Sequence, residues 1–478
     1  MTSRSLAAQA GRTLTVWTPE DKAFWQQQGE AIAKLNLWIS VPALFVSFAV
    51  WQVWSVVAVS LPGLGFKYST NQLFWLAAAP ALSGATLRIF YSFMIPLVGG
   101  RRWTAISTAS LLIPALGIGF AVQDNTTSYP TMLVLALLCG LGGGNFSSSM
   151  ANISYFFPKD RKGSALGVNA GLGNLGVSVV QFLSPIVVTV GVLGVFGGEA
   201  QTIVKNGQAT QVWMQNAAFI WVPWIAITSI AAWFAMNDVA DAKASFAAQA
   251  EIFVRKHNWL MCVLYLGTFG SFIGFAAGFP LLIKSQFPQV NPLAYAWLGP
   301  LVGALVRPFG GWLSDKLGGA RVTLWDFWLL AAGVLGVLYF LPKGAGTYAL
   351  GFGPVDGSFA GFFASFLVLF VATGIGNGST FRMIPVIFNT LKQREARATD
   401  AAAKAQALKE GTVLGAAAVG FAGAFGAYGG FFIPKSYGTS ITATGGPEAA
   451  LWVFFAFYLA CVAITWWFYA RRDAEMPC

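Results

Sequence analysis

Twelve apolar runs, each long enough to cross a lipid bilayer as a helix, constrain this chain more than any other feature. A spanning helix needs roughly 20 mainly apolar residues to cross about 30 Å of hydrocarbon. Only 10% of the residues are charged, whereas a soluble protein carries about 25%. We therefore predict an all-α polytopic membrane protein with spans at residues 37–61, 73–98, 104–122, 131–157, 164–190, 217–236, 259–283, 293–313, 322–342, 359–389, 411–434 and 449–470.

Lysine and arginine are unequally divided between the two sides that these spans define. With the N-terminus inside, 21 of the 29 basic residues lie in cytoplasmic segments. Basic residues concentrate on the cytoplasmic side of membrane proteins, so both termini are expected there. This division also explains the net charge of +11 without a nucleic-acid partner. Five basic residues lie in the outside loops: Lys67, Lys205, Lys284, Lys343 and Lys435.

The chain repeats itself at an interval close to half its length. The segment RIFYSFMIPLVGGRRWT (88–104) aligns without gaps on RPFGGWLSDKLGGARVT (307–323), at an offset of 219 residues. GLGGG (140–144) likewise matches GIGNG (374–378), and GSALGVNA (163–170) matches GTVLGAAA (411–418). Two six-helix halves of the same architecture are typical of transporters whose site lies near the midplane between the halves.

These patterns give a domain plan. Residues 1–36 are polar and lack the pattern of a cleaved signal peptide, so we expect a retained cytoplasmic tail. A six-helix bundle (37–236), a cytoplasmic linker (237–258), a second six-helix bundle (259–470) and a short cytoplasmic tail (471–478) follow.

The chain has few residues suited to metal or enzyme chemistry. Its four cysteines show no paired spacing, and three lie in apolar stretches where cysteine usually packs as a small hydrophobe. His257 is the one histidine. We therefore expect no metal, no cofactor and no enzymatic activity, since no nucleophile–base set is visible.

Three arginines interrupt the apolar spans. Arginine at the centre of a spanning helix costs roughly 2.5–3.5 kcal/mol, so such a residue is a functional candidate unless it reaches an interface or pairs with an acid. Arg88 and Arg307 occupy the same place in the two halves, and we predict that they face each other and clamp an anion. Arg382 lies nearer the cytoplasmic end of its span, which favours a role in gating or snorkelling. The acids nearest to the spans, Asp326 and Glu410, are expected at cytoplasmic helix ends.

Several longer motifs are specific enough to suggest a family. GGWLSDKLGGARVT (310–323) is similar to the loop signature of the major facilitator superfamily, with Asp315 and Arg321 at its charged positions, whereas the first-half copy has Pro96 in place of the acid. FSSSMANISYFFP (146–158), GSALGVNAGLGNLGVSVVQ (163–181) and GTFGSFIGFAAGFP (267–280) are similar to the glycine- and asparagine-rich signatures of the NarK-type nitrate/nitrite porters of that superfamily, which the chain resembles. The likeness runs from TPEDKAFW (18–25) to the last span.

This resemblance implies the major facilitator fold, nitrate and nitrite as substrates, and a monomer in the lipid of a bacterial cytoplasmic (inner) membrane, in the setting of anaerobic nitrate respiration. It also implies that Arg88 and Arg307 are the substrate arginines. Phe146, Asn174, Tyr265, Gly171, Phe48 and Phe269 are the further substrate-binding candidates. Each aromatic ring taken alone is more often plain helix packing. Glycines spaced four apart (Gly163, Gly167, Gly171; Gly411, Gly415) are most simply close helix contacts.

The mechanism we predict is exchange of nitrate entering against nitrite leaving, by alternating access. Proton-coupled transporters usually carry acids or histidines in their pathway, and none is evident at mid-membrane. Two arginines without a counter-ion favour movement of the loaded carrier over the empty one. The alternatives are a proton-coupled nitrate symporter, a carrier for another small anion, or an anion receptor that moves nothing.

Overall fold

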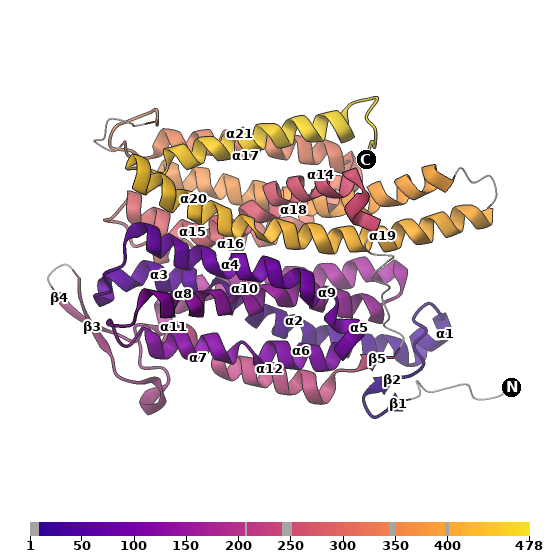
Figure 1. Cartoon of the computed structure of the whole chain (residues 1–478), viewed down its shortest axis with the longest axis horizontal. Helices are drawn as coiled ribbons and strands as arrows, with labels where there is room; N and C mark the ends of the chain where they lie inside the picture. The colour runs from indigo at the N-terminus through magenta and orange to yellow at the C-terminus, as the bar shows by residue number, and fades with distance from the viewer. Residues whose placement is uncertain (1–8, 206–207, 241–250, 344–349, 397–400) are drawn as a thin grey trace. The chain divides into compact units, whose positions relative to one another are not determined.

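The computed structural model describes residues 9–205, 208–240, 251–343, 350–396 and 401–478. Helices dominate it (Figure 1). Those of the first half are α1 (Lys22–Phe24), α2 (Glu30–Gln52), α3 (Trp54–Ser60), α4 (Thr70–Tyr91), α5 (Met94–Val98), α6 (Gly100–Ala109), α7 (Leu112–Ala121), α8 (Tyr129–Leu138), α9 (Gly140–Phe156), α10 (Lys159–Val187), α11 (Asn216–Phe219) and α12 (Val222–Ala235). The second half holds α14 (Lys256–Tyr265), α15 (Ser271–Gln286), α16 (Leu298–Leu317), α17 (Gly319–Phe340), α18 (Phe359–Ala396), α19 (Ala401–Ala427), α20 (Gly429–Thr444) and α21 (Glu448–Thr465).

Shorter helical segments extend or join these helices. Three have π-helical geometry: η1 (Trp25–Gly29), η5 (Leu266–Gly270) and η7 (Trp466–Ala470). Four are single turns: η2 (Leu61–Leu64), η3 (Gly194–Gly197), η4 (Glu251–Val254) and η6 (Pro292–Ala294). Because η5 directly follows α14 and precedes α15, it bulges one predicted span without ending it.

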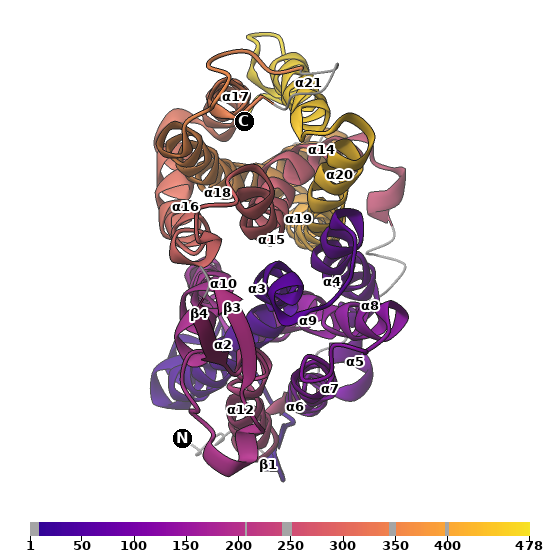
Figure 2. The same ribbon diagram turned by 90° about the vertical axis from the view of Figure 1, so that its left-hand side faces the viewer.

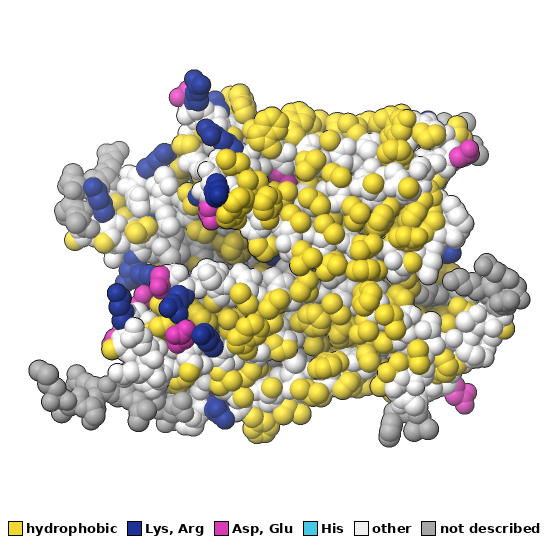
Figure 3. All heavy atoms as spheres, turned by 180° about the vertical axis from the view of Figure 1, so that it is seen from behind, with side chains coloured by type: hydrophobic (Ala, Val, Ile, Leu, Met, Phe, Trp, Pro, Cys, Tyr) yellow, Lys and Arg dark blue, Asp and Glu magenta, His cyan; other side chains and the backbone are white. Residues whose placement is uncertain are grey.

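Every predicted span coincides with a helix or with a run of consecutive helices. Within the described residues, eleven helical stretches are long and apolar enough to cross a membrane. The remaining predicted span, 293–313, corresponds to α16, which also contains the charged residues Arg307, Asp315 and Lys316. Hydrophobic side chains cover the flanks of the helices, whereas lysine and arginine gather at helix ends (Figure 3). This surface suits lipid, and the prediction of an all-α membrane protein is confirmed.

The chain divides into two compact units. Unit 1 comprises Met1–Val53, Gly63–Phe66 and Ser83–Ala244, and unit 2 comprises Trp54–Pro62, Lys67–Leu82 and Ser245–Cys478. The division of the sequence near residue 244 falls in the predicted linker (237–258), of which residues 241–250 lie outside the described part. Unit 2 also contains α3, which packs on α15. Figure 2 shows the helices of each unit viewed nearly end-on.

Small β-structures accompany the helices of unit 1. β1 (Gln9–Ala10) pairs antiparallel with β2 (Thr13–Leu14), and β2 pairs parallel with β5 (Asp238–Val239). β3 (Gln201–Lys205) and β4 (Gln208–Val212) form an antiparallel hairpin, with Gln201 opposite Val212. The first sheet therefore ties the segment before α1 to the segment after α12.

Part of residues 9–36, predicted as a cytoplasmic tail, packs against α9. Leu14, Phe24 and Trp25 are buried in a cluster with Ile153 and Phe156 of α9. The indole nitrogen of Trp17 donates a hydrogen bond to the backbone oxygen of Tyr155 (2.9 Å). The sequence gives little warning of this packing because the segment is short, polar and without helical periodicity.

The prediction that spaced glycines mark close helix contacts is wrong for one of the two sets. No described atom lies within 4 Å of a Cβ added at Gly163, Gly167 or Gly171. In α10 the close contacts are made by Gly173, beside Leu44, and by Gly176, beside the backbone of Phe45. Gly411 and Gly415 of α19 do pack, against Asn389 and Pro385 of α18.

Candidate functional site

Arg88 of α4 is completely buried inside unit 1. Its Nε donates a hydrogen bond to the backbone oxygen of Gly143 in α9 (2.9 Å). The guanidinium carbon lies 4.6 Å from the ring centre of Phe146 and 5.1 Å from that of Trp51. A cation over aromatic faces is stabilised by the negative potential of the rings. The N–H groups of a guanidinium point outward in its own plane. The cation is therefore held in a fixed orientation.

The rings around Arg88 support one another. Phe48 meets Phe146 edge-on at 6.0 Å and Trp51 at 5.4 Å. The structure therefore unites three of the sequence candidates, Arg88, Phe146 and Phe48. Sequence reasoning missed Trp51, although it lies three residues after Phe48, a spacing that places both side chains on one face of α2.

Asn174 and Gly171 of α10 were further candidates in the first half. Asn174 is buried, and its side-chain oxygen has no hydrogen-bond partner among the described residues. Gly171 leaves open space in front of its Cα, again with respect to the described residues. The part of these two residues in an anion site stays a prediction.

Arg307 of α16 is half-buried inside unit 2. Its Nη1 is enclosed and has no hydrogen-bond partner within the described part of the chain. The guanidinium carbon lies 5.5 Å from the ring centre of Phe381 in α18. A buried guanidinium N–H without an acceptor is costly, and an anion would satisfy it. Phe381 was not among the sequence candidates, and no repeat or spacing pointed to it.

Tyr265 and Phe269 lie where α14 passes into η5. The two rings are stacked, with centres 5.4 Å apart and planes inclined by 26°. A Cβ added at Gly426 of α19 would lie 2.8 Å from Tyr265 and 3.4 Å from Phe269. The π-helical geometry of η5 changes which side chains face inward, and such bulges are frequent at functional sites. The part of this pair in an anion site stays a prediction.

A glycine run packs against the arginine-bearing helix in each unit. In unit 1, Gly143 accepts the hydrogen bond of Arg88 and contacts Gly84 of α4. In unit 2, a Cβ added at Gly378 of α18 would lie 2.4 Å from the backbone oxygen of Arg307. These runs are the matched GLGGG and GIGNG segments, so the internal repeat in the sequence corresponds to a repeat in the geometry.

The loop signature forms an ion pair in each unit, but with different partners. In unit 2 the Nε of Arg382 donates to Asp315 Oδ1 at 2.8 Å, while Arg321 is exposed. In unit 1, where Pro96 replaces the acid, Arg101 instead donates through its backbone N (2.8 Å) and Nε (3.1 Å) to Asp238. The sequence did not predict this substitute, because Asp238 is far from Arg101 along the chain.

The two copies of the signature share the same backbone conformation at one glycine. Gly99 and Gly318, aligned in the repeat, have φ values of 96° and 90°. Residues with a Cβ rarely adopt this conformation. Each glycine ends one helix and begins the next, which fixes the direction of the following helix in both units.

Asp326 requires a correction. We expected it at a cytoplasmic helix end, but it is 4% exposed and lies inside unit 2. Both carboxyl oxygens are enclosed, and neither makes a hydrogen bond within the described residues. The expectation failed because Asp326 begins an apolar stretch of α17 whose depth the sequence does not reveal. Glu410 is exposed and lies within α19, not at its end.

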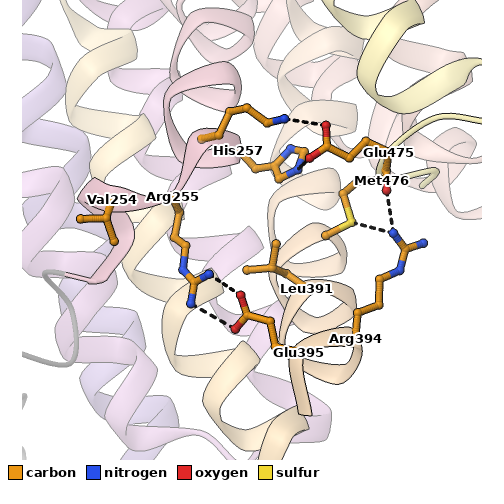
Figure 4. A pocket seen from close by; sticks show the side chains of 9 residues that line it. Val254, Arg255, His257, Leu391, Arg394, Glu395, Glu475 and Met476 are labelled. Atoms are coloured by element: carbon orange, nitrogen blue, oxygen red, sulfur yellow. Dashed lines mark hydrogen bonds and ion pairs between the residues drawn. The ribbon is translucent and has the colours of Figure 1, made fainter. Parts of the chain in front are cut away.

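A separate cavity of about 320 Å³ lies among charged residues of unit 2, and none of the sequence candidates lines it. Arg255 pairs with Glu395, and Lys256 donates to Glu475 at 2.6 Å (Figure 4). The hydrogen bond from Lys256 holds the pKa of Glu475 below its ordinary value, and the one from Arg255 does the same for the pKa of Glu251. His257 Nε2 lies 3.3 Å from Glu475. The contacts of Glu475 tie the C-terminal segment to the start of α14. The pair of Arg255 and Glu395 ties the residue before α14 to the end of α18.

Metal ligands are not gathered anywhere in the described part of the chain. No group of three or more His, Cys, Asp or Glu residues there could hold an ion. The four cysteines are free; Cys139, Cys262 and Cys461 are buried.

Comparison with known proteins agrees with this geometry. The model of the Major Facilitator Superfamily matches residues 43–355. The chain is 49% identical over 462 residues to "Nitrate/nitrite transporter NarU" of Salmonella typhimurium, covering 97% of both proteins. It is 40% identical over 479 residues to "Probable nitrate/nitrite antiporter NarK2" of Thermus thermophilus, covering 99% of this chain and 100% of the relative.

Solved structures share the fold at low sequence identity. The inward-open xylose transporter XylE from E. coli aligns with a TM-score of 0.60 at 11% identity, covering 90% of this chain and 96% of that one. The nucleoside transporter NupG aligns with a TM-score of 0.56 at 12% identity, covering 90% of this chain and 98% of that one.

Two helical units that each carry an arginine in an apolar span, fully buried in one and half-buried in the other, define a polytopic membrane transporter. The near full-length identity to its relatives narrows the class. The chain belongs to the NarK-type nitrate/nitrite porter family of the Major Facilitator Superfamily.

Proposed function

We propose that this protein is an exchanger that brings nitrate into the cell and carries nitrite out, and that Arg88 and Arg307 both bind the transported anion. The observation that carries the proposal is the buried Nη1 of Arg307, which lacks an acceptor within the described residues. Relatives up to 49% identical are named nitrate/nitrite transporters, which supports nitrate and nitrite as the anions.

The residues around the arginines suit a small flat anion. Nitrate and nitrite are planar, and guanidinium groups donate hydrogen bonds in a plane. In unit 1, Phe146 and Trp51 fix the orientation of the Arg88 guanidinium. Asn174, Tyr265, Phe269, Phe48 and Gly171 are proposed as further parts of the site, on the strength of the family resemblance.

Exchange follows from the charge of the empty site. A carrier with two arginines and no anion must change conformation with uncompensated positive charge in a low dielectric, which is costly. A bound anion neutralises part of that charge, so the loaded carrier should move more readily than the empty one. The NarK2 relative is named a probable nitrate/nitrite antiporter, which supports the same mechanism.

Uptake of labelled nitrate into vesicles containing the purified protein tests this proposal. Vesicles would be loaded with nitrite, with nitrate or with inert buffer, each with and without an inward proton gradient. We expect uptake that requires an internal anion and ignores the gradient. Uptake into empty vesicles driven by the gradient would identify a proton symporter instead. Binding without uptake would identify a receptor, and competition by formate but not nitrite would identify a carrier of another anion.

The remaining expectations complete the proposal. We propose a monomer without cofactor in the bacterial cytoplasmic membrane, with both termini in the cytoplasm. The hydrophobic flanks and the basic residues at helix ends support this placement (Figure 3). Gating is assigned to Arg382 together with Asp315, because their ion pair joins α18 to α16.

A further inference from the structure

Asp326 is the buried acid in unit 2 for which the exchange mechanism has no use. Its carboxyl group is enclosed by protein, and both oxygens lack hydrogen-bond partners within the described residues. No lysine, arginine or histidine of the described part forms an ion pair with it, although eleven such pairs occur elsewhere. An ionised carboxylate without donors is far more costly to bury than a neutral carboxylic acid. A proton on one oxygen removes that charge.

The space for this carboxyl group is made by a glycine. A Cβ added at Gly376 of α18 would lie only 2.1 Å from Asp326 Oδ2 and 2.6 Å from the methyl carbon of Thr268. The backbone of Gly376 thus approaches the acid closely. The carboxyl group is enclosed within the bundle and does not reach its surface.

The same turn of α18 also contacts the helix of Arg307. A Cβ added at Gly374 would lie 2.4 Å from the backbone oxygen of Gly303, and one added at Gly378 would lie 2.4 Å from that of Arg307. Both partners belong to α16. One helical turn, residues 374–378, therefore separates the acid on α17 from the anion-binding arginine on α16. A charge at Asp326 would be felt at Arg307 through protein of low dielectric.

The fold itself does not require an acid at this place. The repeat register of 219 residues aligns Asp326 with Ser107 in unit 1. Ser107 is also buried, and its backbone oxygen accepts a hydrogen bond from Asn145 (3.4 Å). A neutral residue is thus sufficient at the equivalent position, so the acid of unit 2 calls for a separate explanation.

We propose that Asp326 is a proton-binding site coupled to anion binding at Arg307. The proton comes from water and forms an O–H bond on the carboxylate. An ionised Asp326 competes with the anion for the positive potential of Arg307, so proton binding strengthens anion binding, and by linkage the anion strengthens proton binding. Nitrate and nitrite would each take up the same proton, which leaves exchange proton-neutral. This inference rests on the proposed function.

The groups that face Asp326 do not supply an alternative charge. Tyr458 of α21 interacts electrostatically with Asp326 and with Cys461, and both of these α21 side chains are neutral when protonated. From η5 it meets Thr268, and from α18 Gly376, both neutral. The charged residues of α16 and α18 are engaged elsewhere or remote in register: Arg382 pairs with Asp315, and Arg307 lies against Phe381. His257 is also engaged elsewhere, because its ring contacts the hydroxyl group of Tyr469 in η7.

Calorimetry of nitrate binding to the purified full-length protein tests the proposal. Titrations in two buffers of different ionisation enthalpy give the number of protons taken up per nitrate, between about pH 6 and about pH 9, where buried carboxylic acids titrate. We expect proton uptake by the wild type and nitrate binding that weakens roughly tenfold towards high pH. Asp326→Asn, which imitates the protonated acid, should bind nitrate without proton uptake and with little dependence on pH.

Two further variants keep the outcomes distinct. Asp326→Ser copies the neutral residue of unit 1 and replaces Asp326→Asn in the experiment if the asparagine variant does not fold. It should likewise bind nitrate without proton uptake and with little dependence on pH. Arg307→Lys should lose nitrate binding. Nitrate binding by the wild type without proton uptake at any pH, or equal proton uptake by Asp326→Asn, would overturn the inference alone. Absence of nitrate binding by the wild type would overturn the proposed function, and the inference with it.

Discussion

At the scale of single residues, the proposed anion binding depends on the chemistry of arginine within an apolar span. Arg88 is fully buried over two rings, and Arg307 has an enclosed N–H group without an acceptor in the described part of the chain. A lysine keeps the charge but offers a compact ammonium in place of a planar fork, so it cannot bind a flat anion through two parallel bonds.

We therefore predict that Arg88→Lys and Arg307→Lys each reduce nitrate uptake by roughly ten- to a hundredfold, corresponding to one charge-assisted hydrogen bond of about 1.5–3 kcal/mol. Initial uptake rates in reconstituted vesicles give the comparison. Arg472→Lys, at an exposed position, is the matched control and should keep wild-type uptake. Full transport by both buried lysine variants would rule out the arginines as anion ligands.

At the scale of helices, close packing depends on particular glycines. In α10, a Cβ added at Gly176 would meet the backbone oxygen of Phe45 at 2.2 Å, whereas one added at Gly167 meets no described atom within 4 Å. Backbone cannot move aside as the end of a side chain can. The two positions therefore differ in what a methyl group costs.

We predict that Gly176→Ala destabilises the protein by about 1–3 kcal/mol through overpacking. Gly167→Ala should be neutral or stabilising by about 0.5–1 kcal/mol, because alanine is the better residue within a helix. Thermal unfolding of the two variants in the same detergent gives the comparison. Equal loss of stability in both would show that open space at Gly167 is not a property of the folded protein.

The C-terminal segment offers a test by pH. The hydrogen bond from Lys256 lowers the pKa of Glu475 from its ordinary value of 4.5, so the stabilisation is present above that pH and is lost as the pH falls through the lowered value. Because Glu475 is exposed, the effect should stay below about 1 kcal/mol.

We predict that Glu475→Gln lowers the melting temperature slightly at neutral pH and that this deficit disappears as the pH falls through the lowered pKa of Glu475, where the wild-type carboxylate becomes protonated as well. The exposed Glu199, which has no ion pair among the described contacts, supplies the control variant Glu199→Gln. A Glu475→Gln deficit that persists undiminished in acid would show that packing, not charge, holds the segment.

At the scale of the whole molecule, the sequence predicted the twelve helical stretches and the repeat because both follow from strong local signals. Apolar length marks a span, and α16 was recognised from its apolar run 293–313, which ends before Asp315 and Lys316. The glycine run beside each arginine was likewise evident from the matched GLGGG and GIGNG segments.

What the sequence did not predict depends on contacts between residues distant along the chain. Asp238 replaces the missing signature acid of the first half, and Trp51 completes the rings around Arg88. Leu14 and Trp25 are buried against α9 although they lie in a polar segment. The depth of Asp326 was misjudged because apolar length alone does not tell which face of a helix is enclosed. Each of these depends on which faces of two helices meet.

The central claim for the whole molecule is that only the loaded carrier changes conformation. It is tested most directly by measuring both anions at once. Vesicles loaded with labelled nitrite would be placed in nitrate carrying a different label, and both amounts followed over time. The account predicts that one nitrite leaves for each nitrate that enters, at every concentration. Nitrate accumulating without an equal loss of nitrite would contradict it.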